Sequence, residues 1–99
     1  MWNSLDTVFN GALKGVVTAT QLPDVPCNLV KLKALNANPG NIYIGNSTVT
    51  KPAGGGDNTT GGLELAPGDE TGWIPISNLN KLYRICDSES DRLQYFVLR

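Results

Sequence analysis

The chain of 99 residues contains no histidine and few charged residues. The missing histidine removes the usual general base of nucleophilic catalysis and the commonest metal ligand. Lys, Arg, Asp and Glu make up 17 % of the residues, against about 25 % in a typical domain. The formal net charge is −1. Nucleic-acid-binding domains are usually basic, so we expect no nucleic-acid partner.

Long apolar runs are also absent. No stretch approaches the ~20 apolar residues that cross a bilayer, and no signal-peptide pattern opens the chain. We therefore expect no membrane partner and synthesis in a cytoplasm. The two cysteines, Cys27 and Cys86, make a poor zinc site without histidine. We favour two small buried hydrophobes over a disulfide, because a reducing compartment disfavours the latter.

The acidic residues form no convincing catalytic or metal site. Asp69 and Glu70 are adjacent in the chain, so on a strand they would point to opposite faces. Asp87, Glu89 and Asp91 alternate, but the glycine and distal glutamate of an EF-hand loop are missing. The glycines of 52–62 lack the Lys-Ser or Lys-Thr of a phosphate-binding loop. We expect no catalytic, cofactor or metal site, and hence no enzyme.

Alternating apolar residues predict β-strands along most of the chain. In 27–36, Val30, Leu32 and Ala34 share one face, and Ile42 and Ile44 flank Tyr43 in a segment expected in an edge hairpin. Gly45 there indicates a bulge or a close backbone approach. Further strands are predicted at 16–20, 47–51, 63–65, 73–76, 82–86 and 93–98, the last two as a hairpin around 87–91.

Proline and glycine mark the turns between these strands. Pro39-Gly40 predicts a type II turn with a positive φ at Gly40, and Pro67-Gly68 predicts another turn. Pro75 restricts its strand to an edge or bulge. About seven short strands indicate one all-β domain over 1–99, a small antiparallel β-sandwich or jelly-roll-like fold. It would carry an N-terminal arm at 1–12 and a flexible glycine-rich loop at 52–62.

Several apolar residues are candidates for contacts between chains. The arm spaces its apolar residues as in a helical turn or a loose strand, and they should be buried on the chain's own core or on a neighbour. The strand 93–98 is apolar on both faces, and the face opposite its core side could be covered by the arm or by another subunit. The candidate interface residues are Trp2, Leu5, Val8, Phe9, Tyr43 and Phe96.

The order of these segments resembles a small β-sandwich module of tailed-bacteriophage structural proteins. The family pattern has an LP-x-x-P/A-C strand, a V/I-Y-V/I-G strand after an asparagine turn, an L-x-P-G-E/D turn, an L-Y strand and a final aromatic strand. The resemblance covers residues 20–98. Its motifs fall at Leu22-Pro23, Cys27, Asn41 to Gly45, Leu65 to Asp69, and Leu82-Tyr83.

A free-standing chain without a stalk resembles a capsid decoration, or cement, protein most. The resemblance implies a virion protein that binds the outside of the capsid, with the major capsid protein as partner. It also implies a symmetric homo-oligomer, for which we favour a trimer over a dimer. It identifies no catalytic residue and no cofactor. The alternative is a tail, fibre or baseplate module that binds a glycan of the host surface.

Overall fold

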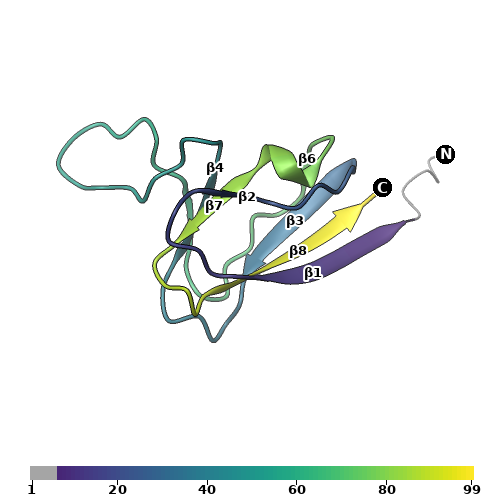
Figure 1. Cartoon of the computed structure of the whole chain (residues 1–99), viewed down its shortest axis with the longest axis horizontal. Helices are drawn as coiled ribbons and strands as arrows, with labels where there is room; N and C mark the ends of the chain where they lie inside the picture. The colour runs from purple at the N-terminus through teal and green to yellow at the C-terminus, as the bar shows by residue number, and fades with distance from the viewer. Residues whose placement is uncertain (1–6) are drawn as a thin grey trace.

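The computed structural model, which describes residues 7–99, consists of two antiparallel sheets of four strands each (Figure 1). Sheet A has the order β1-β8-β3-β6, with bounds Val8–Lys14, Arg92–Leu98, Leu29–Ala34 and Ile74–Pro75. Sheet B has the order β2-β7-β4-β5, with bounds Thr20–Gln21, Tyr83–Cys86, Ile42–Gly45 and Leu63–Leu65. A short 3-10 helix, η1, spans Leu79–Lys81. The predicted all-β sandwich class is confirmed.

The core lies between the inner faces of the two sheets. Val30, Leu32 and Ala34 of β3 are fully buried, as their alternation predicts. Ile42 and Ile44 of β4 contribute from sheet B. Within residues 7–99, no helix has the length and apolar character to cross a membrane.

The predicted arm contains the start of a strand. Residues 8–12 belong to β1, which pairs with β8 from Val8↔Leu98 to Lys14↔Arg92. A helical turn over these residues is therefore wrong, and the strand alternative is right. The strand expected at 16–20 is also wrong, because β1 ends at Lys14 and β2 begins only at Thr20. The intervening chain crosses from sheet A to sheet B, and on the way the Val16 carbonyl accepts a bond from the Cys86 amide.

The predicted C-terminal hairpin is wrong. β7 lies in sheet B and β8 in sheet A, so residues 87–91 form a crossing between the sheets. Instead of pairing with each other, β7 pairs with β4, and β8 pairs with both β1 and β3. The edge position expected for β4 is likewise wrong, because β4 lies between β7 and β5.

The chain after β4 forms a turn and not the strand predicted at 47–51. The Val49 amide donates to the Asn46 carbonyl, and the Val49 side chain is buried. A Cβ on Gly45 would lie 2.8 Å from Val49 Cγ2, and one on Gly62 would lie 2.6 Å from it. Neither alternative for Gly45 is right: its register with β7 runs on without a bulge, and the group that approaches it is the side chain of Val49 and not a backbone.

The glycine-rich segment is a loop, as predicted. Residues 50–61 are all exposed and project away from the two sheets (Figure 1). A hydrogen bond from the Thr50 amide to the Thr60 carbonyl closes its base. We call residues 50–61 the projecting loop.

The two predicted turns differ in outcome. At Pro67-Gly68 the Asp69 amide donates to the Ala66 carbonyl, and Gly68 has a φ of +90°, so this turn is confirmed. The type II turn at Pro39-Gly40 is wrong, since Gly40 is not among the glycines with positive φ. A glycine is required there for space: a Cβ would lie 2.6 Å from Asp87 Cβ. Pro75 lies in β6 at the edge of sheet A, as predicted.

Candidate functional site

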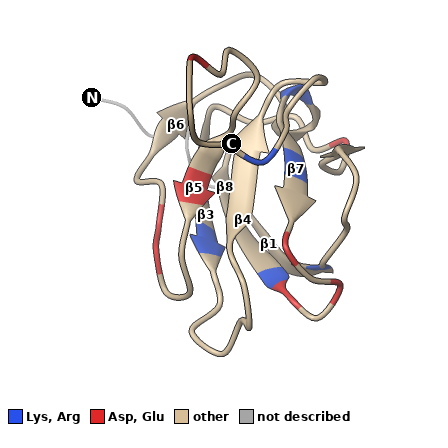
Figure 2. Cartoon of the chain, turned by 90° about the vertical axis from the view of Figure 1, so that its left-hand side faces the viewer, with Lys and Arg blue, Asp and Glu red and all other residues tan. Residues whose placement is uncertain are grey.

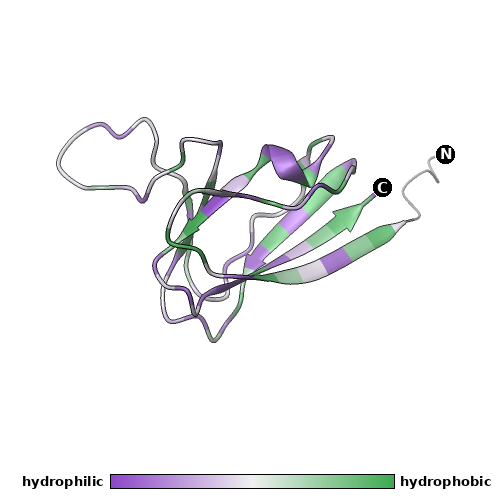
Figure 3. Cartoon of the chain, viewed as in Figure 1, coloured by the Kyte–Doolittle hydropathy of each residue, from purple (hydrophilic) through white to green (hydrophobic). Residues whose placement is uncertain are grey.

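The outer face of sheet A carries a row of apolar side chains across all four strands. Val8 lies opposite Leu98, Leu98 opposite Leu29, and Leu29 opposite Pro75. These residues alternate with core residues, so their side chains point away from sheet B. Val8 is 49 % exposed, Pro75 is exposed, and the two leucines are half-buried. In Figure 3 the apolar end of β8 lies beside that of β1.

Two exposed aromatic side chains lie on the same face. The ring centroids of Trp73 and Phe96 are 6.1 Å apart with an interplanar angle of 55°. Lys31 Nζ lies 4.8 Å from the centroid of Trp73 and 3.5 Å from Glu70 Oε1. These contacts hold the indole against the sheet, although Trp73 and Phe96 remain 45 % and 42 % exposed. The docking face, as we name it, consists of Val8, Leu29, Trp73, Pro75, Phe96 and Leu98.

A shallow open groove of about 550 Å³ runs beside Phe96. Its polar side chains include those of Asn10, Lys31, Lys33 and Gln94, which lie on three neighbouring strands. Gly11 leaves room for the Tyr95 ring, because a Cβ there would lie 2.7 Å from Tyr95 Oη. The groove therefore places amide and ammonium groups beside the aromatic ring of Phe96.

Two of the six predicted interface residues, Val8 and Phe96, belong to the docking face. They lie on the neighbouring strands β1 and β8. Trp2 and Leu5 lie outside the described residues. Trp73 was not among the predicted interface residues, although Pro75, two residues further along the chain, indicated an edge strand there.

The other two candidates lie elsewhere. Phe9 points to the inner side of β1, where it packs against the chain's own core, and the Arg99 guanidinium lies 4.7 Å from its ring centroid. Tyr43 is only 7 % exposed, and its hydroxyl lies 3.4 Å from Asp87 Oδ1. Burial raises the pKa of Tyr43 above its usual value. Neither ring therefore adds to the docking face.

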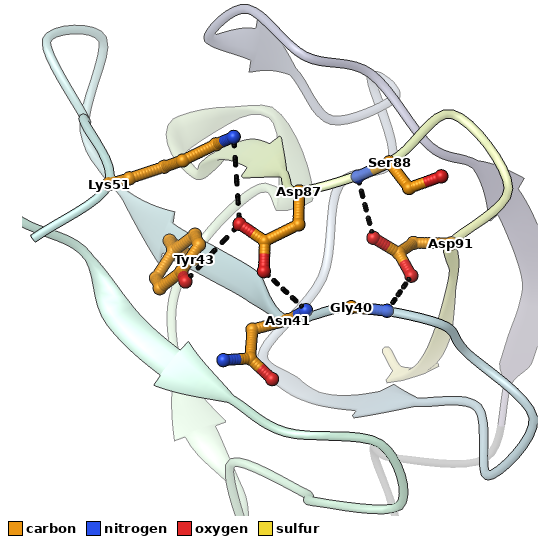
Figure 4. Close-up of polar contacts among 7 residues, drawn as sticks. All are labelled: Gly40, Asn41, Tyr43, Lys51, Asp87, Ser88 and Asp91. Carbon is orange, nitrogen blue, oxygen red and sulfur yellow. Dashed lines mark hydrogen bonds and ion pairs between the residues drawn. The ribbon is translucent and has the colours of Figure 1, made fainter.

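The acidic segment 87–91, which crosses between the two sheets, is held in place by polar contacts of its carboxylates (Figure 4). Asp91 is fully buried, and its carboxylate accepts bonds from the backbone amides of Gly40 and Ser88, each at 2.9 Å. Asp87 accepts from the Asn41 amide at 2.9 Å and pairs with Lys51 at 3.5 Å. Both carboxylates thus serve to fix the 38–41 segment against the crossing.

The other carboxylates considered above have separate partners. Asp69 accepts a bond from the Ala66 amide within its own turn, and Glu70 pairs with Lys31 on the docking side. Across residues 7–99, no three His, Cys, Asp or Glu side chains gather in a way that would hold a metal ion. Figure 2 shows that acidic and basic residues are spread over both strands and loops.

Arg84 is a buried cation that the sequence pattern did not identify. Its Nη2 donates to the Lys14 carbonyl at 3.2 Å, and its Nη1 donates to the Gln21 carbonyl at 3.5 Å. The guanidinium therefore ties the end of β1 to β2, which lies in the other sheet. Burial lowers the pKa of Arg84. The strand predicted at 82–86 contains Arg84, but no role was predicted for this residue.

Both cysteines are buried free thiols, as favoured from the sequence. Burial raises the pKa of Cys27 and of Cys86 above the ordinary value of 9.0. A raised pKa favours the neutral thiol in the folded state, so this contribution to stability is complete below pH 9.0 and is lost as the pH rises above it.

We expect both thiols to react slowly with an aromatic disulfide reagent at mildly alkaline pH. The thiolate is the reacting species, and burial limits both its formation and its access. The measurement is the absorbance of the released thiolate with time, with the unfolded protein in denaturant as the control for full reactivity. Rapid release of one equivalent from the folded protein would contradict the prediction.

No family model matches this chain, and neither a curated protein nor a solved structure matches it.

Proposed function

We propose that the protein is a virion structural protein that binds the outside of a tailed-phage capsid as a cement protein. Its partners are the major capsid protein and further copies of itself. The proposal rests on the order of motifs over residues 20–98 and on the docking face. The single observation that carries it is the exposed pair of Trp73 and Phe96 beside an apolar row on one sheet face.

The docking face has the chemistry of a protein-binding surface. Large aromatic side chains in the centre of an interface contribute most of the binding energy, and Trp is among the most enriched residues there. The flanking aliphatic side chains exclude water from that centre. A stable contact of this kind buries about 1,600 Å² in total over both partners.

Cementing follows from several such contacts acting together. One copy that touches two neighbouring capsid subunits binds the second at a high effective concentration once the first is bound. A protein that binds only the assembled shell stabilises it by mass action. Weak contacts on each subunit therefore suffice to brace the shell.

The test is to add the purified protein to phage heads that lack it and to measure bound protein after sedimentation. We expect saturable, stoichiometric binding. Removing both aromatic side chains with Trp73→Ala and Phe96→Ala should weaken binding at least about tenfold, because hot-spot truncations each cost about 1–2 kcal/mol or more.

Leu63→Ala is the matched control, since Leu63 is 58 % exposed but lies on β5 of sheet B. This variant should bind heads as the unmodified protein does. Equal binding by the double aromatic variant would remove the docking face from the proposal. Failure of the unmodified protein to bind any head would overturn the cement function.

One observation favours a second candidate function, which is glycan binding by a tail, fibre or baseplate module. Trp73 is an exposed aromatic of the kind that stacks on sugar rings, and the groove beside Phe96 carries the polar groups of Asn10, Lys33 and Gln94. Binding to host cells, abolished by Trp73→Ala and accompanied by no binding to heads, would support this candidate over the first.

A further inference from the structure

The outer edge of β1 has the properties of a self-pairing strand. Within residues 7–99, four strands form the sheet edges: β1 and β6 in sheet A, β2 and β5 in sheet B. β6 and β2 have two residues each and β5 has three, whereas β1 has seven. In Figure 1, β1 runs along the border of sheet A with β8 on one side.

The hydrogen-bonding pattern shows which backbone groups of β1 face outward. Thr7 and Arg99 exchange both of their backbone hydrogen bonds, so they form a hydrogen-bonded pair at the start of the ladder. In an antiparallel ladder such pairs alternate, and the backbone groups of the residues between them point away from β8. Val8, Asn10, Ala12 and Lys14 are these intervening residues.

The Lys14 carbonyl confirms this direction, because it accepts its bond from Arg84 and not from β8. The amide and carbonyl groups of Val8, Asn10 and Ala12 have no backbone partner within residues 7–99. They form a ready template for another strand.

The usual protections of an edge strand are scarce on β1. It contains no proline, and its pairing with β8 runs through seven consecutive partners without a bulge. Its one charged residue, Lys14, is at the end. Phe9 and Leu13, on the core side of the strand, are only half-buried, so a neighbouring strand would cover more of them.

We propose that β1 pairs antiparallel with β1 of a second copy of this chain, which joins the two A sheets into one eight-stranded sheet. The occupant is a second copy because, among the edge strands within residues 7–99, only β1 is long enough to match β1. When both copies contribute the same edge to the contact, the resulting dimer has two-fold symmetry. This replaces the trimer as the proposed assembly, and it extends the docking face across the pair.

The inference rests on the proposed function only in naming a second copy as a partner. The test uses the isolated protein without heads, so its failure is distinguishable from a failure of capsid binding. Light scattering of the unmodified full chain should give twice the chain mass of 10.6 kDa. A monomer or a trimer at the concentrations used for structural work would overturn the proposal.

Asn10→Pro should halve the measured mass while the circular dichroism of the fold is retained. Proline removes the outward amide of Asn10, and this amide takes no part in the ladder to β8. Asn10→Val is the matched control, because it changes the side chain but keeps the amide, and it should remain a pair. A pair that survives Asn10→Pro would overturn edge pairing.

Hydrogen exchange on the unmodified protein keeps the proposal testable if Asn10→Pro unfolds the chain. The amides of Val8, Asn10 and Ala12 should exchange at least about tenfold more slowly at high protein concentration than on dilution, because pairing protects them. The amide of Gly54 in the projecting loop should show no such dependence. Fast exchange of the three β1 amides at all concentrations would overturn the proposal.

Discussion

Asp91→Ala is expected to destabilise the fold by about 3 kcal/mol or more. Each hydrogen bond to a charged group contributes about 1.5–3 kcal/mol, and a buried donor left without a partner costs about 1–3 kcal/mol. The substitution removes the acceptors of the Gly40 and Ser88 amides at once. The measurement is the free energy of unfolding from a denaturant titration followed by tryptophan fluorescence.

Two further variants make this result specific to the buried carboxylate. Asp91→Asn keeps one side-chain acceptor and should lose roughly half as much stability. Asp57→Ala, in the exposed projecting loop, should change the free energy of unfolding by less than about 0.5 kcal/mol. Equal stability of Asp91→Ala and Asp57→Ala would show that the carboxylate does not hold the crossing.

Gly15→Ala is expected to destabilise the protein by about 3 kcal/mol, because overpacking at a rigid site is costly. A Cβ on Gly15 would lie 2.2 Å from the Ser88 carbonyl oxygen and 2.9 Å from that of Asp91. Both neighbours are backbone atoms of the same crossing that Asp91 anchors, so they move only if the crossing moves. Thermal unfolding followed by circular dichroism measures the effect.

Gly54→Ala is the matched control for this substitution. Gly54 has no heavy atom within 4 Å of a built Cβ, and its φ is not positive. Its replacement should be neutral or slightly stabilising, because alanine lowers the entropy of the unfolded chain. If Gly15→Ala unfolds at the same temperature as Gly54→Ala, the close packing of the crossing is not a determinant of stability.

Strands with a simple alternation were predictable from the sequence. β3 places Val30, Leu32 and Ala34 inward, and β4 places Ile42 and Ile44 inward, because burial of one sheet face imposes a period of two. Pro75 marked an edge strand correctly, since proline lacks the amide that an interior strand must donate. These features follow from local chemistry.

Strand partners were not predictable in the same way. Leu82–Cys86 and 93–98 have the spacing of a hairpin, yet β7 and β8 lie in different sheets. The alternation of a strand reports which of its faces is buried but not which strand lies beside it. Both partners of β8, β1 and β3, come from the N-terminal part of the chain, and only the packed structure reveals them.

The roles of buried polar groups were also hidden. Asp91 was predicted to lie in the connection 87–91 of a hairpin, and Arg84 received no role. Each becomes buried only because segments distant in sequence close over it, such as Gly40 over Asp91 and Lys14 over Arg84. A buried polar group is retained where its hydrogen bonds are supplied by the fold.

The candidate site was predictable in part. Val8 was identified as an apolar residue of the expected arm. Phe96 was identified because it lies on the strand 93–98, which is apolar on both faces. Trp73 required the structure, because its exposure depends on the position of β6 at the edge of sheet A and on its contact with Lys31. The docking face is a product of strand order and not of any one segment.

The amino-acid sequence by itself determined the all-β class, the inward faces of β3 and β4, the projecting loop and the buried state of the cysteines. Each of these depends on local periodicity, turn chemistry or side-chain hydrophobicity. The tertiary structure alone decided the sheet order, the crossing at 87–91, the buried hydrogen bonds of Asp91 and Arg84, and the position of β1 at the edge of sheet A. The physical reason is that these features depend on contacts between distant segments, which form only when the two sheets pack.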